Sequence, residues 1–586
     1  MNVISSVLKR RSRVHFLLRG DRSIVTAHGS RTHRSCAAMK KRRLGVLIAL
    51  FLVAYLGIGA RLVHYGLAVP VSSGPIGIVS PVASRPNIVD RNGKLLATDL
   101  RLVSLYAEPR RIVDADEVVE KLSAVIPNLD WKATHRKLRS GAAFQWLKRQ
   151  LTPRQQAAIL ALGIPGIGFR PEVGRLYPGG ATASHILGHV DIDNRGLAGM
   201  ERYIDRQGLA DLRAAGMTND VRLEPVRLSI DLRVQSIVRE TIKEAMSAYQ
   251  AEAAGAVILD ISTGEILAMA SVPDYNPNEP SRMMPNGKID KEYEKGWFNR
   301  MSNATFEMGS TFKSFTLAMG LDAGVINLDS IVDASRPLRM GGFTIKDFHG
   351  RNRPLTVPEV FRYSSNIATV KIADMVGMDE HQAFLTRLGL LTKMETELPE
   401  IATPVQPRIW KKINSATISY GHGMATTPLQ TAVAAAALLN GGKLIAPTFL
   451  ARDRKEGAPA TKQVLRPETS AEMRYLFNWN GLTGSGRSAQ VPGYHVGGKT
   501  GTADKVINGR YATDLNFNAF LGGFPMHDPR YVVLTIIDAP LTGEQGRRLA
   551  SFTAAPMVKE IVRRTAPLLG VQPLFGTDES YLLIGY

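Results

Sequence analysis

The sequence predicts a mixed α/β (α+β) protein in three parts: one membrane helix, an N-terminal mixed domain, and a large domain. In the large domain, a helical lobe is inserted between the two halves of one antiparallel sheet. Three observations support this prediction. An uncharged apolar run follows a basic tail, strand and helix patterns mix up to about residue 225, and strand patterns open and close the remainder. The 586 residues, 44% hydrophobic and 21% charged, suffice for two or more domains with substantial cores.

The formal net charge of +21 is concentrated at the N-terminus. Residues 1–43 hold twelve lysines and arginines and one acid, Asp21, so this tail carries +11 and the other 543 residues carry +10. No aromatic-basic repeat or recognition motif accompanies the charge, and we therefore expect no nucleic-acid binding. The only cysteine, Cys36, lies in this basic tail, so no disulfide is expected to stabilise the exported part.

An apolar run from Leu44 to Ala60 contains no charged residue, and Leu62 and Val63 extend it past Arg61, whose side chain can reach the interface. We predict one membrane span over residues 44–63. The basic residues 40–43 place the tail in the cytoplasm and the rest of the chain outside the inner membrane, in the periplasm. A cleaved signal peptide is the alternative, but the basic region is too long and no clean Ala-x-Ala site follows.

A first exported domain is predicted over residues 85–225, after a linker over residues 64–84. Residues 87–109 are typical of two strands around an Asn92-Gly93 hairpin turn. Amphipathic helices are indicated over residues 114–126 and 152–163, with Asp114 and Thr152 near their starts. Since no convergent chemical motif occurs here, the domain is interpreted as a spacer or docking module.

A single large domain is predicted over residues 226–567, followed by a tail over 568–586. A strand and a long helix open it within residues 226–246, and two apolar strands joined by a turn at 262–264 follow. Helical patterns dominate residues 310–442. Strands return around a turn at Asn508-Gly509 and at 531–540, before a closing helix near 552–564. Strands at both ends imply one sheet whose halves are far apart in sequence.

Three short patterns follow one another in this domain. The first alone carries little weight, because residues 6–9 of the tail also spell SxxK. Together, SxxK, an SDN-type triplet and KTG are the signature of serine acyltransferases of the penicillin-binding and β-lactamase type. At these positions the sequence resembles the penicillin-binding protein transpeptidase family. The matching residues are Ser310-Thr311-Phe312-Lys313, Ser364-Ser365-Asn366 and Lys499-Thr500-Gly501-Thr502.

Ser310 is predicted to lie in the first turn of a core helix with one apolar face. Because three residues make about one turn of a helix, the Lys313 amine is expected to lie near the Ser310 hydroxyl. On this segment alone a helix cap is favoured over a nucleophile, but the other two motifs reverse that preference. The apolar residues of the helix are Phe312, Phe315, Met319 and Leu321.

Lys313 is the predicted general base, which requires a pKa lowered from about 10.4 to about 7, roughly 3 units or about 4 to 5 kcal/mol. Burial and a second cation, Lys499, are expected to lower it. Lys499 is predicted to be a permanent charge that also attracts an anionic substrate terminus. Ser364 is predicted to relay a proton between the lysines and the leaving amine. The side-chain amide of Asn366 is predicted to contact the substrate backbone or Lys313. Ser365 is interpreted as only a helix start.

Thr500 and Thr502 are predicted to bind a carboxylate through their hydroxyls, and Gly501 to let the substrate lie along the strand as an added β-strand. The resemblance implies an oxyanion hole formed by the backbone amides of Ser310 and Thr502, each donor being worth about 3 to 4 kcal/mol.

Longer segments resemble class B penicillin-binding proteins. Residues 85–99, 172–190 and 196–205 are similar to boxes of the N-terminal pedestal of that class, and residues 419–442 to the segment before the third motif. Residues 491–505 are similar to the division-specific branch, and Met308 stands where the family usually has proline. No glycosyltransferase-like region lies between span and pedestal, so a monofunctional protein is expected.

The resemblance implies a peptidoglycan D,D-transpeptidase that cross-links stem peptides ending in D-Ala-D-Ala at the division septum, with a possible carboxypeptidase side activity. β-Lactams would acylate Ser310. A membrane glycosyltransferase and other division proteins are the expected partners, and no cofactor is expected. An elongation-specific transpeptidase, a β-lactamase or β-lactam sensor, and a non-catalytic division scaffold are the alternatives.

A metal site is a further alternative, because His185, His189, Asp191 and Asp193 imitate metal-ligand spacing. Gly188 and the pedestal resemblance favour a structural turn over a metal site here.

Overall fold

The structure is a computed structural model that describes residues 49–61, 85–127, 129–209, 223–282, 290–452, 459–507, 510–542 and 548–575. It divides the chain into two compact units, with the boundary after Ser80. In the first unit, residues 49–61 form one helix, which is the middle of the predicted span. The tail over 1–43 and the ends of that span, 44–48 and 62–63, lie outside the described residues. None of the helices in the described ranges is long and apolar enough to cross a membrane.

The second unit begins with a five-stranded sheet built around one long central strand, β2 (Leu95–Ala107), which pairs antiparallel with three others. The predicted hairpin at Asn92-Gly93 is confirmed, and Gly93 has a φ of 80°. Residues 226–227, predicted to open the large domain, pair in parallel with β1 and so extend this sheet. The other strands are β1 (Ile88–Val89), β3 (Gln145–Leu151), β4 (Ile167–Leu176) and β5 (Val226–Arg227).

Three helices, α2 (Ala115–Val125), α3 (Trp131–Leu138) and α4 (Pro153–Ala161), share a core with β2 and β3. The predicted helix starts are confirmed: the Asp114 carboxylate caps α2, and Thr152 caps α4 in a reciprocal capping box with Gln155. Two short helices, α5 (Ser184–Leu187) and α6 (Gly199–Ile204), complete this part. Its core residues include Leu105, Val119, Leu122, Leu147, Leu151 and Ile159.

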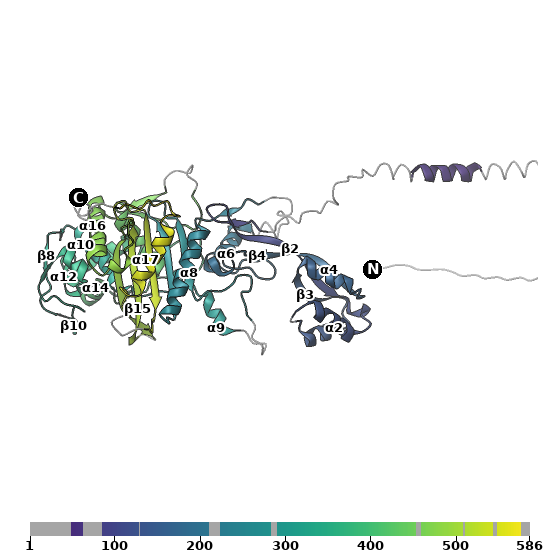
Figure 1. Cartoon of the computed structure of the whole chain (residues 1–586), viewed down its shortest axis with the longest axis horizontal. Coiled ribbons are helices and arrows are strands. Elements are labelled where there is room, and N and C mark those ends of the chain that lie inside the picture. Colours follow the sequence, from purple (N-terminus) through teal and green to yellow (C-terminus); the bar gives the residue numbers. More distant parts are fainter. Residues whose placement is uncertain are drawn as a thin grey trace, which may run out of the picture. The chain divides into compact units, whose positions relative to one another are not determined.

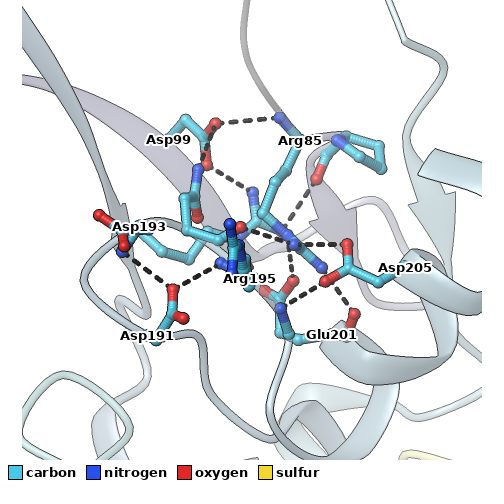
Figure 2. Close-up of polar contacts among 11 residues, drawn as sticks. Arg85, Asp99, Asp191, Asp193, Arg195, Glu201 and Asp205 are labelled. Carbon is cyan, nitrogen blue, oxygen red and sulfur yellow. Dashed lines mark hydrogen bonds and ion pairs between the residues drawn. The ribbon is translucent and has the colours of Figure 1, made fainter. Parts of the chain in front are cut away.

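A buried ion network holds the start of this unit together (Figure 2). Arg85 Nε lies 2.7 Å from Glu201 Oε2, and Arg175 Nε lies 2.7 Å from Glu201 Oε1. The two guanidiniums also pair with Asp205 and Asp99, at 2.8 and 3.0 Å respectively. The side chains of Arg85, Arg175 and Glu201 are all 0% exposed. The network therefore fixes residue 85 against a helix more than a hundred residues later in the chain.

The central sheet of the large domain has five antiparallel strands in the order β14-β15-β16-β6-β7. Strand β16 pairs with β6, with Val533 opposite Ile258, so the two distant halves join as the sequence predicts. The predicted turn at 262–264 is confirmed, while that at Asn508-Gly509 lies outside the described residues. The strands are β6 (Ala253–Asp260), β7 (Ile266–Val272), β14 (Gly497–Ile507), β15 (Arg510–Phe524) and β16 (Tyr531–Asp538).

Both faces of this sheet are covered, because successive side chains on a strand point to opposite sides. On one face, Val533 and Ile537 pack with the helices α8 (Leu232–Ala248) and α17 (Ala554–Thr565), the latter being the predicted closing helix (Figure 1). On the other face, Val532 and Leu534 join the core of the helical lobe. Burial on both faces explains why these strands read as continuous apolar runs.

The inserted lobe is built around α10 (Lys313–Asp322), whose first nine residues are all buried. The prediction of a single apolar face on this helix is wrong, because other helices surround it on every side. The other helices of the lobe are α11 (Val357–Tyr363), α12 (Asn366–Val376), α13 (Met378–Arg387), α14 (Lys412–Ile418), α15 (Pro428–Leu439) and α16 (Pro467–Thr483). The one-turn helix α9 (Lys291–Glu294) lies apart from them, near α8 (Figure 1).

Six short strands, which the sequence did not predict, interrupt the lobe as three two-stranded sheets. They are β8 (Ile331–Asp333) with β11 (Pro354–Thr356), β9 (Leu338–Met340) with β10 (Phe343–Ile345), and β12 (Lys443–Ile445) with β13 (Thr461–Gln463).

Candidate active site

Ser310 lies in a single tight helical turn, η5 (Gly309–Phe312), that leads directly into α10. Within the described residues its hydroxyl forms no hydrogen bond, so Ser310 does not cap this helix. The neighbouring Thr311 instead closes the turn by donating to the Met308 carbonyl at 2.8 Å. The Ser310 side chain is partly exposed, whereas Thr311 and Phe312 are buried.

The Lys313 side chain is fully buried, and its amine donates two hydrogen bonds to one residue. These go to the carbonyl and the hydroxyl of Ser364, the latter at 2.9 Å. Burial lowers the pKa of Lys313 well below its ordinary value, the charge of Lys499 lowers it further, and Asp347 opposes them. Burial and the second cation thus act in the direction expected from the sequence.

Lys499 lies on β14 and is 1% exposed. Its amine donates to the Thr500 carbonyl at 3.2 Å and lies 5.9 Å from the centre of the Phe361 ring. Burial lowers the pKa of Lys499 to about 7. This lowered pKa runs against the expectation of a permanent charge on Lys499.

The second motif occupies the junction between α11 and α12. Ser364 ends α11 in the left-handed conformation, with a φ of 57°, which points its hydroxyl at Lys313. Ser365 is the N-cap of α12, as expected of a helix start. Asn366 donates from Nδ2 to the Lys346 carbonyl at 2.9 Å. Of the two partners expected for this amide, Lys313 is not among its described contacts.

Strand β14 lies directly against the turn that carries Ser310, and glycines make this contact. A β-carbon at Gly501 would lie 2.4 Å from the carbonyl oxygen of Met308. A β-carbon at Gly421 would lie 1.9 Å from the carbonyl oxygen of Gly309. Gly309 itself has a φ of 54° and packs on the backbone of Thr502. Gly501 is therefore required for this backbone seam, in addition to the predicted reason of space for a substrate strand.

The two motif threonines differ in their contacts. The Thr500 hydroxyl bonds that of Ser485 at 2.7 Å, while Thr502 Oγ1 accepts from the Ala550 amide at 3.1 Å and keeps its own proton for another acceptor. Strand β14 is at the edge of the sheet, with a described strand partner only on its β15 side. An extended peptide can therefore add to its free side.

Sequence reasoning missed three residues that support the motifs. Asp347 accepts from the Ser365 hydroxyl at 2.8 Å and from the Ile367 amide at 2.9 Å, so it holds the second motif from a loop. Glu307 accepts from the Tyr511 hydroxyl at 3.1 Å and the Gly423 amide at 2.9 Å, which ties β15 and a distant loop to the segment before Ser310. For Ser485, the only local signal was its glycine-flanked loop.

The four candidate metal ligands have other roles. His185 Nε2 lies 2.7 Å from the Gly296 carbonyl, and His189 Nδ1 lies 3.1 Å from the Tyr275 hydroxyl. Burial lowers the pKa of His185 to about 4. The Asp191 carboxylate accepts backbone amides of its own turn, and Asp193 pairs with Arg149 at 2.8 Å. No metal-binding group of three such side chains occurs in the described ranges.

Comparison with known proteins agrees with this geometry. The family model described as penicillin binding protein transpeptidase domain matches residues 254–563, and that described as penicillin-binding protein dimerisation domain matches residues 80–211. The probable peptidoglycan D,D-transpeptidase FtsI of Caulobacter vibrioides is 38% identical over 500 residues, 83% of this chain and 82% of that protein.

Two further relatives match over a similar length. The probable peptidoglycan D,D-transpeptidase PenA of Neisseria gonorrhoeae is 32% identical over 84% of this chain and 85% of its own. The peptidoglycan D,D-transpeptidase FtsI of Escherichia coli K12 is 29% identical over 84% of each chain. Lys313 of the first motif bonds Ser364 of the second, and the third motif packs on the turn that carries Ser310. With these contacts and family models that match most of its length, the chain belongs to the penicillin-binding protein transpeptidase family.

Proposed function

We propose that the chain is a serine D,D-transpeptidase that cross-links peptidoglycan stem peptides through an acyl-enzyme on Ser310. One observation carries the proposal: the amine of Lys313, one helical turn after Ser310, is buried, has its pKa lowered by burial and by Lys499, and donates to the hydroxyl of Ser364. A neutral amine at this point can accept the proton of the serine hydroxyl at ordinary pH.

In the first half-reaction, Ser310 Oγ attacks the carbonyl of the penultimate D-Ala, and Lys313 accepts the proton. The C–N bond to the last D-Ala breaks, and Ser364 passes a proton to the leaving amine. The backbone amides of Ser310 and Thr502 stabilise the oxyanion; the close packing of Gly309 on the Thr502 backbone supports this assignment.

The substrate lies along the free side of β14 as an added strand, with its terminal carboxylate at Thr500 and Thr502. A carboxylate bound there would raise the pKa of Lys499, which favours the charged amine when substrate is present. Asn366 binds the peptide backbone on the opposite side. β-Lactams occupy the same positions, and water in place of an acceptor amine gives the carboxypeptidase side reaction.

The boundaries proposed from the sequence complete this description. Residues 44–63 anchor the protein in the inner membrane with the tail over 1–43 in the cytoplasm, and residues 64–84 link the anchor to the pedestal over 85–225. The transpeptidase domain covers 226–567, and a tail over 568–586 ends the chain. The helix over 49–61 supports the anchor. A membrane glycosyltransferase and other division proteins are the proposed partners.

A role at the division septum is supported by the similarity to two proteins named FtsI and by the sequence around the third motif.

The direct test treats the full-length protein with a fluorescent penicillin and identifies the modified peptide by mass spectrometry. We expect one adduct, on the peptide that contains Ser310, and none in Ser310→Ala, while Ser365→Ala still reacts. An adduct that persists for hours also separates a transpeptidase from a β-lactamase. Labelling at another serine, or unchanged labelling of Ser310→Ala, would refute the proposal.

A further inference from the structure

Four side chains beside the second motif form a continuous stack of guanidinium groups and rings. The central carbon of the Arg351 guanidinium lies 4.2 Å from the centre of the Tyr363 ring. That of Arg362 lies 5.2 Å from the same ring and 5.4 Å from the Trp479 ring. A loop, the end of α11 and α16 thus contribute to one feature, which we call the arginine stack (Arg351, Tyr363, Arg362 and Trp479).

The arginine stack adjoins both the second and the third motif. Tyr363 directly precedes Ser364, whose hydroxyl binds Lys313. A β-carbon at Gly484 would lie 3.2 Å from Cγ of Arg362, so the Arg362 side chain passes over the backbone next to Ser485. The Ser485 hydroxyl in turn bonds that of Thr500. The stack therefore lies near the threonine that is proposed to bind the terminal carboxylate of the substrate.

Neither guanidinium of the stack is neutralised by the part of the chain that the structure describes. Arg351 and Arg362 form no ion pair with any described carboxylate, and both retain exposed surface. The acids of the same segments have other partners: Asp347 binds Ser365 and Ile367, and Glu359 pairs with Arg353 at 2.6 Å. Stacking on aromatic rings fixes the plane of a guanidinium while its N–H groups stay available for an anion.

We propose that Arg351 and Arg362 bind a carboxylate of the acceptor, next to the amine that receives the acyl group. The inference deepens the proposed function and rests on it. The terminal D-Ala leaves from the side of Thr500, and the acceptor amine must approach the same carbonyl carbon from the side that the leaving amine vacates. An acceptor that enters there brings its own neighbouring carboxylate to the side of Thr500 and Ser485, where Arg362 of the arginine stack lies beside it.

The transfer step balances without any further reactant. The neutral acceptor amine forms a C–N bond to the acyl carbon, the bond from that carbon to Ser310 Oγ breaks, and one amine proton passes to Ser310 Oγ by way of Lys313 and Ser364. The carboxylate takes no part in bond making. Its contact with the two arginines orients the amine, since bidentate N–H to carboxylate hydrogen bonds are directional.

The test compares two acceptors that differ only in this charge, D-alanine and D-alaninamide. The full-length protein is acylated by a thioester donor, and the ratio of aminolysis to hydrolysis is measured for each acceptor. We expect the parent to prefer D-alanine. Arg362→Gln should lower this preference about fivefold or more, the size of one lost charge-assisted contact, and Arg362→Lys should restore part of it. Arg563→Gln, on α17, removes an equal charge elsewhere and should leave the preference unchanged.

Titration of Ser310 with fluorescent penicillin counts active sites in every preparation and checks that each variant folds. An unchanged preference in both Arg362→Gln and Arg351→Gln would overturn the inference. So would an equal fall for both acceptors, which would indicate only a structural role for the stack. Failure of the parent to form any adduct on Ser310 would instead refute the proposed function.

Discussion

Arg85 and Arg175 in the pedestal and Lys313 and Lys499 in the transpeptidase domain are all buried cations, but the two pairs have opposite surroundings. The arginines share the carboxylate of Glu201 and have one further acid each. The lysine amines contact only hydroxyl and carbonyl oxygens. The charge of Lys499 further lowers the pKa of Lys313, and Asp347 is the one acid that offsets this shift.

The difference in surroundings decides what each pair does. Burial lowers the pKa of Arg175, but Glu201 and Asp99 outweigh that effect and hold it above its ordinary value. Burial lowers the pKa of both lysines, and Asp347 offsets only part of this shift at Lys313. Acid partners thus favour the charged form of Arg175, whereas burial favours the neutral form of both lysines. Under the proposed mechanism, buried cations stabilise the fold in one domain and take part in the chemistry in the other.

The largest expected effect comes from removing the proposed base. Lys313→Met should slow acylation by penicillin about 10³-fold or more, within the range for loss of general base catalysis. Its melting temperature should not fall, because an apolar side chain replaces a buried amine that has no acid partner. Stopped-flow acylation and calorimetry measure the two quantities. Acylation within about tenfold of the parent would contradict the role of Lys313.

Lys499→Met tests how much the burial of an unpaired amine lowers the free energy of unfolding, and how this effect changes with pH. Below about pH 7, Lys499 is charged in both the folded and the unfolded states, and its burial costs on the order of 4 kcal/mol. Between about pH 7 and 10.5 the unfolded state binds more protons, so the stability of the parent rises. The variant should be more stable than the parent at pH 6, by a margin that shrinks toward pH 10. Urea unfolding at several pH values measures it; a constant margin would contradict the lowered pKa.

Glu201→Gln should lower the stability of the protein, whereas Lys499→Met should raise it at pH 6. The reason is that two buried arginines lose the carboxylate that they share. We expect a loss of about 3 kcal/mol in the free energy of unfolding. Glu560→Gln breaks an exposed pair with Arg563 and should change stability by at most about 0.5 kcal/mol. Urea unfolding of both variants at neutral pH makes the comparison. Equal losses would show that burial of the pedestal network has no special effect.

Asp347→Asn gives the smallest expected effect. Because Asp347 raises the pKa of Lys313, its neutralisation should move the acidic limb of the acylation profile to lower pH, by about one unit or less. Ser365→Ala removes a hydrogen bond to Asp347 but keeps the charge, so it should leave the limb in place and cost about 1 kcal/mol of stability as a lost helix cap. If the acidic limb of the pH profile moved equally in both variants, the cause would be a structural change and not the charge of Asp347.

Local patterns were enough to predict the strands of the central sheet, the turns at Asn92-Gly93 and 262–264, and several helix caps, since each depends on residues close in sequence. The joining of two distant half-sheets was also predicted, because strand patterns occur at both ends of the domain. The ion pair between Arg85 and Glu201 spans 116 positions, and nothing near either residue marks it. Asp347 likewise reaches the second motif only through the fold, and the lowered pKa of Lys499 depends on a burial that no spacing reveals.

The backbone seam of Gly309, Gly421 and Gly501 has a consequence for drug resistance. At this seam β14 and the loop of Gly421 meet the turn that carries Ser310 mainly through main-chain atoms, with the Thr311 methyl group beside Gly501. Mutants selected under β-lactam pressure should therefore keep all three glycines and instead change the loops that border the cleft.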